Sequence, residues 1–170
     1  MTPLTKAMRN ELARDPAITA LLGSSTTWPT WIFLDKPSVK FENSQKCLIV
    51  ISTYDNMWTP MNLHNTMEFP TVQIDIWADP TRGTDSSVRV EDAEEKINAV
   101  HKLVLKHFHT VDMARPGGGM LNWGTQAQVD SKTGIWVAGS HLTYGPLIRD
   151  VKDVQGALVG SYRYGVNLLS

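Results

Sequence analysis

FPTVQIDIWADPTRGTDSSVRVEDAEEKINAVHKLVLKHF, residues 69–108, places a strand, a turn and a long helix one after another. In the first part, apolar side chains alternate with more polar ones, which is the two-residue period of a β-strand with one face on a core. The apolar set is Val72, Ile74 and Ile76, and the opposite set is Gln73, Asp75 and Trp77. The polar face is expected to be solvated or paired with a neighbour.

The second part predicts an amphipathic helix over residues 88–108. Apolar residues recur there at spacings of three and four and form one continuous face: Val90, Ala93, Ile97, Val100, Val104 and Phe108. Acidic residues crowd the first turns and basic residues the last, as the helix dipole favours. A helix with one long apolar face has to cover a sheet.

Two short helices are predicted near the N-terminus. The first begins at Thr2 and Pro3, a capping side chain followed by a proline that needs no N–H partner. Its apolar stripe is Leu4, Met8 and Leu12. The second begins at Asp15 and Pro16 and ends at Gly23.

The remaining apolar and alternating segments predict strands. Two precede the quoted stretch, within residues 30–37 and 46–53, and the later ones cover 121–129, 135–144 and 160–168, with a turn at 130–134. The order favours an α+β fold in a single domain, residues 1–170. Its largely antiparallel or mixed β-sheet is covered by the 88–108 helix and the short N-terminal helices.

Charge and hydropathy exclude several classes of protein. Sixteen Lys and Arg against 17 Asp and Glu leave a net charge of −1, and no basic run is present. Stable nucleic-acid binding is therefore not expected. No stretch approaches about 18 apolar residues, and the N-terminal segment lacks an apolar signal core. We therefore expect no membrane contact, no secretion, and a cytoplasmic place of work.

The motifs of cofactor-dependent enzymes are absent. The phosphate loop, the dinucleotide glycine fingerprint and the zinc-protease helix are not found. The glycine-rich segment 115–120 follows a helix and precedes a strand, the reverse of a phosphate cradle, and is expected to be a flexible loop. Cys47 is the only cysteine and lies in the apolar run CLIVI, so it is expected to be buried. No cofactor is expected.

Histidines near the end of the long helix are the strongest candidates for a metal site. His107, His109 and Asp112 lie close together in sequence, and His101 lies two turns earlier. On a helix, however, His107 and His109 point in different directions, and a helix C-terminus favours an unliganded histidine. Surface histidines without a metal are therefore expected.

Asp75 is the strongest candidate for a general base, but no carboxylate or histidine partner is evident for it. We expect no catalytic residue. Asp75 is instead expected to be structural, hydrogen-bonded or paired across the sheet or a subunit boundary. Arg163 in the last strand is its candidate partner by charge.

A long connection is predicted between two strands at DNMWTPMNLHNTMEF, residues 55–69. It carries too much apolar surface for a solvated loop. Either it folds over its own core or it packs against another subunit, and the second is favoured because methionine and aromatic residues are enriched in interfaces. The candidate interface residues are Met57, Trp58, Met61, Leu63 and Met67.

The order of elements resembles the tail terminator, or tail completion, proteins of long-tailed bacteriophages. The resemblance rests on the helix DPAITALLG (15–23), the segment VQIDIWAD (72–79) before a long amphipathic helix, and the closing strand GSYRYGVNL (160–168). It covers most of the chain. The long 55–69 connection and an added hairpin at 121–144 depart from the family pattern.

The resemblance implies a virion protein assembled in the host cytoplasm into a ring, usually of six copies. Such a ring sits at the head-proximal end of the tail, stops polymerisation of the tail tube protein and presents a surface to the head–tail connector. DNA passes through it without stable binding, and no catalytic residue is required. The alternatives are another neck or head–tail connector ring protein, or a small cytoplasmic enzyme that uses Asp75 and the histidines.

Overall fold

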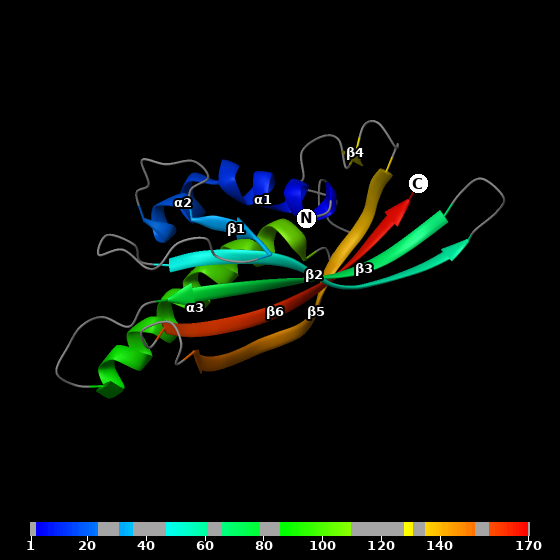
Figure 1. Ribbon diagram of the computed structural model, residues 1–170. Coiled ribbons are helices and arrows are strands. Elements are labelled where there is room, and N and C mark those ends of the chain that lie inside the picture. Colours follow the sequence, from blue (N-terminus) through cyan, green and yellow to red (C-terminus); the bar gives the residue numbers. More distant parts are fainter. Residues whose placement is uncertain are drawn as a thin grey trace.

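The computed structural model (Figure 1) describes residues 3–23, 31–35, 47–60, 66–78, 86–109, 128–130, 135–151 and 157–169. Within these residues, three helices and six strands follow one another: α1 (Pro3–Arg14), α2 (Pro16–Leu22), β1 (Ile32–Leu34), β2 (Cys47–Pro60), β3 (Thr66–Ala78), α3 (Ser86–Phe108), β4 (Gln128–Asp130), β5 (Ile135–Val151) and β6 (Ala157–Leu169). This order confirms the expected α+β fold.

The described strands form one sheet in the order β1-β2-β3-β6-β5-β4. β1 pairs with β2 in parallel, and every other neighbouring pair is antiparallel. The sheet is therefore mixed but largely antiparallel, as predicted. β6, the last element, lies between β3 and β5, so the C-terminal strand is central in the sheet.

The helix α3 covers the sheet at β3, β6 and β5. Its apolar face is buried as the three- and four-residue spacing predicts: Ala93, Ile97, Val100, Val104 and Phe108 are each no more than 1% exposed. A glycine in β6 permits the close approach, because a Cβ at Gly160 would lie 2.5 Å from Cγ2 of Ile97. The long helix and the last strand therefore pack backbone to side chain.

The two N-terminal helices complete the layer on the same core. The α1 stripe of Leu4, Met8 and Leu12 is buried. Asp15 caps α2 by accepting a hydrogen bond from the backbone N–H of Ala17 at 2.8 Å. Gly23 follows α2 with a φ of 96°, a conformation that glycine adopts without strain. Both helix starts and the stop therefore lie where the sequence places them.

The inner face of the sheet carries the core. In β3, Val72, Ile74 and Ile76 are fully buried, while Gln73, Asp75 and Trp77 on the opposite face are only partly buried. Cys47 at the start of β2 is also buried, as expected of a small apolar side chain. The structure therefore confirms the alternation of buried and partly buried residues predicted for residues 72–77.

The 55–69 segment is not a long loop, and that expectation is wrong. Residues 55–60 continue β2 and residues 66–69 belong to β3, paired from Asp55 with Thr71 to Pro60 with Thr66. We call these two segments, 55–60 and 66–69, the hairpin arm. In Figure 1 this end of the β2–β3 hairpin extends past the helices. Residues 61–65 lie outside the described part of the chain.

The predicted hairpin after α3 is present. β4 pairs antiparallel with β5, and β5 continues to Val151, beyond the predicted end at residue 144. Register shifts in the β5–β6 ladder let this strand bend along its neighbour. The predicted strand residues 121–127, the turn 131–134 and the glycine-rich segment 115–120 lie outside the described residues.

Candidate assembly surface

The outer face of the sheet, opposite the helices, carries a polar cluster where four strands run side by side. The register places Asp75 of β3 beside Ser161 of β6, and Gln73 beside Arg163. On the other side of β6, Tyr144 of β5 pairs with Arg163. Residues that are far apart in sequence therefore meet on one face.

A chain of hydrogen bonds links the polar side chains. Ser161 Oγ donates to Asp75 Oδ1 at 2.6 Å, and Gln73 Nε2 donates to both carboxylate oxygens of Asp75 at 3.1 and 3.2 Å. Arg163 Nε donates to Gln73 Oε1 at 3.4 Å. Asp75 is therefore hydrogen-bonded across the sheet, but it and Arg163 are linked through Gln73 and not paired directly. The structure therefore does not show the direct Asp75–Arg163 pair that their charges suggest.

Two exposed tyrosines flank the guanidinium group of Arg163. Its Cζ lies 3.8 Å from the ring centroid of Tyr54 in β2 and 4.9 Å from that of Tyr144. Both distances are within the range of cation–π attraction. The rings are 56% and 47% exposed, and Leu147 nearby in β5 is 42% exposed. We call Tyr54, Tyr144, Leu147 and Arg163 the tyrosine–arginine patch.

The patch has the composition of a protein interface. Tyrosine and arginine are enriched at the centres of protein–protein contacts. The two rings hold the guanidinium in one orientation before any partner arrives. Of the five N–H donors of arginine, only that on Nε is used by a neighbouring side chain in the described structure.

The hairpin arm begins directly after Tyr54 and so adjoins the patch. Three of the predicted interface residues lie in its strands: Met57 and Trp58 in β2, and Met67 in β3. Met61 and Leu63 lie outside the described residues. The structure thus brings the arm and the patch to one region of the sheet, and the role of the five residues stays a prediction.

His107 is not the surface histidine that the sequence suggests. Its Nε2 lies 2.8 Å from Asp15 Oδ2 and its Nδ1 3.3 Å from Glu11 Oε1, so it joins the end of α3 to α1 and α2. Burial alone would raise the pKa of Asp15, but hydrogen bonds from His107 and from the backbone N–H groups of α2 hold it below its ordinary value. The contact is a structural connection between helices.

His101 and His109 also have structural partners. The His101 ring stacks on Tyr162 at 3.5 Å between centroids, and its Nε2 hydrogen bonds with the Tyr164 hydroxyl at 2.9 Å. Burial, with a smaller effect of the charge of His109, lowers the pKa of His101 to about 4. His109 Nδ1 accepts a hydrogen bond from the Leu142 N–H at 3.0 Å.

These histidines do not assemble a metal site. In the described ranges of the chain, no group of three or more His, Cys, Asp or Glu side chains could hold a metal ion. Asp112 lies outside those ranges. None of the described helices is long and apolar enough to cross a membrane.

Sequence reasoning missed Tyr54 and Tyr144. Each lies in a strand with another aromatic residue, and nothing local marks it as a neighbour of Arg163. The only available signal is the alternation of GSYRYGVNL, which puts Arg163 on the face opposite the buried Tyr162 and Tyr164. The strand order that completes the patch depends on long-range pairing.

Comparison with known proteins gives a likeness of fold. No protein-family model matches the chain, and no curated protein matches it. Among solved structures, it is similar to a chain in the structure described as "Virion of native gene transfer agent (GTA) particle". The TM-score is 0.55 at 10% sequence identity, and the match covers 98% of this chain and 95% of that chain.

Proposed function

We propose that this protein is a structural component of a phage-type virion and, more specifically, a tail terminator. In this role it forms a ring, usually of six copies, that caps the head-proximal end of the tail tube. The ring stops polymerisation of the tube protein and gives the head–tail connector a surface to bind. It assembles in the host cytoplasm and needs neither a cofactor nor a catalytic residue.

The observation that carries the proposal is the likeness to a virion chain along nearly the whole length of both proteins. An end-to-end match means that the α+β fold is shared along nearly the whole length of both chains, and not only in a small motif. The order of elements that resembles tail terminators supports the finer assignment.

The surface features suit a ring subunit. A closed ring of identical copies uses two different surfaces of each subunit, which contact each other head to tail. An arm that extends past the helices and an exposed tyrosine–arginine patch are suitable parts of such contacts. The net charge of −1 suits a channel through which DNA slides without being held.

Binding to separated virion parts tests the proposal. The purified protein is mixed with tail tubes of the same phage and, separately, with heads that carry a portal but neither connector nor tail, and bound protein is measured after sedimentation. We expect binding to tubes that lack a cap and no binding to heads alone. Binding to heads and not to tubes would instead identify a head–tail connector ring protein.

A further inference from the structure

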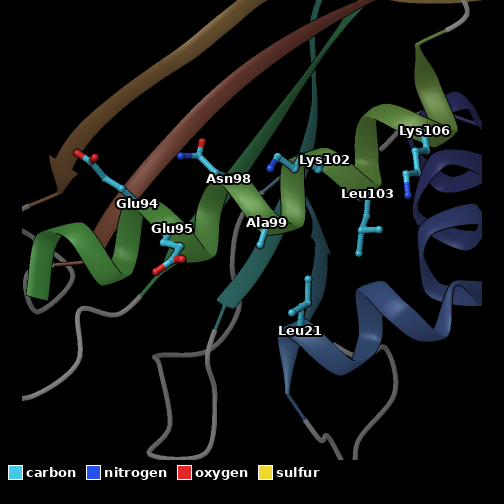
Figure 2. Close-up of a pocket in the computed structure, with 8 residues that line it drawn as sticks. All are labelled: Leu21, Glu94, Glu95, Asn98, Ala99, Lys102, Leu103 and Lys106. Atoms are coloured by element: carbon cyan, nitrogen blue, oxygen red, sulfur yellow. The ribbon is translucent and has the colours of Figure 1, made fainter.

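A groove lies on the side of the molecule opposite the tyrosine–arginine patch. It has a volume of about 770 Å³ and runs between Leu21 of α2 and one face of α3. Figure 2 shows its lining: Leu21, Glu94, Glu95, Asn98, Ala99, Lys102, Leu103 and Lys106. We call it the α2–α3 groove.

The floor of the groove is apolar, one end carries Glu94 and Glu95, and the other end carries Lys102 and Lys106. In Figure 2, Leu21 points from α2 toward Ala99 and Leu103 of α3, and the two glutamates lie toward the N-terminal end of α3. A smaller hollow of about 280 Å³ shares Leu21, Glu95 and Ala99 and extends the apolar surface toward Cys47. Such a floor with a charged rim is typical of a site that receives a protein side chain.

The carboxylates of this groove are available to a partner. Within the part of the chain that the structure describes, neither Glu94 nor Glu95 makes an ion pair or a side-chain hydrogen bond. Their neighbours Asp92 and Lys96 are already joined by an ion pair at 3.0 Å. The two glutamates therefore leave negative charge at the acidic end.

The patch on the sheet supplies the complementary chemistry. Arg163 presents the N–H groups of its two terminal nitrogens, which match a carboxylate in geometry and charge. Tyr54, Tyr144 and Leu147 supply exposed apolar surface around it, as Leu21, Ala99 and Leu103 do in the groove. Cation and aromatic rings on one side thus face carboxylates and an apolar floor on the other.

One molecule cannot make this contact with itself. The patch lies on the outer face of the sheet, whereas the groove lies on the helical layer that covers the inner face. Two different and complementary surfaces on opposite sides define a head-to-tail contact between copies, which closes into a ring when the rotation between subunits permits.

We propose that the tyrosine–arginine patch of one copy docks into the α2–α3 groove of the next, with Arg163 bound by Glu94 and Glu95. The occupant of the groove is a second copy of this chain, and the charge complementarity between Arg163 and the acidic end of the groove selects it. This inference deepens the proposed function, because it rests on ring formation and names the two surfaces that build the ring.

A charge exchange between two variants tests the contact. Arg163→Glu places a carboxylate opposite Glu94 and Glu95, and the double variant Glu94→Lys, Glu95→Lys places two cations opposite Arg163. Each protein alone should self-associate more weakly than the parent, with the dissociation constant raised about tenfold or more. Solution mass is measured at several protein concentrations and at low salt.

An equimolar mixture of the two variants is expected to regain the parent mass. In the mixture, the carboxylate introduced by Arg163→Glu meets the lysine-containing groove, and the unchanged Arg163 of the groove variant meets the unchanged groove of the other copy. Alternating copies therefore restore every contact. Recovery on mixing requires that the two surfaces touch. It is not expected if either surface only supports the fold of its own subunit.

The controls separate assembly from folding. Lys6 is exposed on α1, so Lys6→Glu makes the same kind of charge reversal away from both surfaces and should leave self-association unchanged. Circular dichroism verifies that each variant folds. If Arg163→Glu fails to fold, the groove variant alone must still weaken self-association, because its changes lie on the solvent-facing side of α3.

Two results would overturn the inference. In the first, the folded variants keep the parent mass. If they then lose only binding to tail tubes, the groove is assigned to the tube protein. The other is a mixture of folded variants that stays dissociated. A mixture that recovers the mass but caps no tubes would support the docking contact and contradict the terminator role, so the two proposals fail separately.

Discussion

Asp75 illustrates how hydrogen bonds hold a charged side chain in a strand. Its carboxylate accepts hydrogen bonds from Ser161 on the neighbouring strand and from Gln73 two residues away. Charge-assisted bonds of this kind stabilise a half-buried carboxylate where an unpaired one would destabilise the fold. The sequence predicts the structural role, but the identity of the partner depends on the strand register.

Removal of the serine hydroxyl tests this role. Ser161 is only 5% exposed, so Ser161→Ala leaves Asp75 without a buried donor and should lower the free energy of unfolding by about 1–3 kcal/mol. Urea denaturation measures it. Thr143→Val is the matched control, because its exposed hydroxyl donates to the Arg163 carbonyl and should contribute little. Equal losses for both variants would contradict the assignment.

His101 makes the stability depend on pH. Its pKa is about 4 in the folded protein against 6.5 for an ordinary histidine, so between these values the unfolded chain binds a proton that the folded protein does not. The histidine therefore contributes full stability above about pH 6.5, and that contribution is lost as the pH falls toward 4. Thermal unfolding of His101→Gln should depend less steeply on pH in this window.

The matched control for this measurement is His141→Gln. His141 is exposed in β5, and its replacement should change the pH profile of the parent less than His101→Gln does. A His101→Gln profile that overlays that of the parent from pH 6.5 to 4 would show that protonation of His101 is not coupled to folding.

At the scale of elements, the helices and the core strands follow from local pattern, and the arm does not. The stripes of α1 and α3 and the alternation of β3 each reflect burial against one partner surface, which fixes a period in the sequence. The arm extends past the helices in Figure 1, and its two strands pair with each other through the backbone. Backbone pairing does not depend on side-chain type, so it leaves little signal in the sequence.

Pro70 is one reason why the local sequence pattern does not predict the arm. A proline within a run argues against a strand because it has no N–H to donate. In the structure it pairs with Asn56 of β2, while the β3–β6 ladder skips from Thr71 to Glu68. The strand therefore continues through the proline on one side and loses its partner on the other.

The burial of α3 gives a direct test at this scale. Val100 is 1% exposed, so Val100→Asp buries a charge without a partner and should cost about 3 kcal/mol or more in the free energy of unfolding. Asn98→Asp adds the same carboxylate to the exposed side of the helix and should change stability little. A Val100→Asp protein that melts with the parent would refute the packing of α3.

The 55–69 segment, which includes the hairpin arm, has its own prediction. Changing Trp58 and Met61 to serine should weaken self-association or tube binding while the monomer stays folded, because apolar and aromatic side chains dominate binding energy at interfaces. Solution mass and tube sedimentation measure the two effects, and circular dichroism reports the fold. The contrary result is a double variant that is largely unfolded but whose remaining folded molecules assemble normally. It would show that this segment covers the protein's own core.

At the scale of the whole molecule, the sheet divides the protein into two sides with different chemistry. One side is a helical layer with an apolar groove that is acidic at one end and basic at the other, and the second side is a strand face with a cation between two tyrosines. The sequence alone predicts the layers, since they follow from amphipathic periods. The match between the two sides emerges only when four strands and two helices are assembled, so no local pattern contains it.

The length of tail tubes is the measurement that tests the proposed function most directly. Tube protein from the same phage is polymerised with and without this protein, and lengths are measured by electron microscopy. Tail termination predicts extra density at one end of each tube and no further growth at that end when fresh tube protein is added. Tubes that keep growing from both ends, with no protein bound at either, would contradict it.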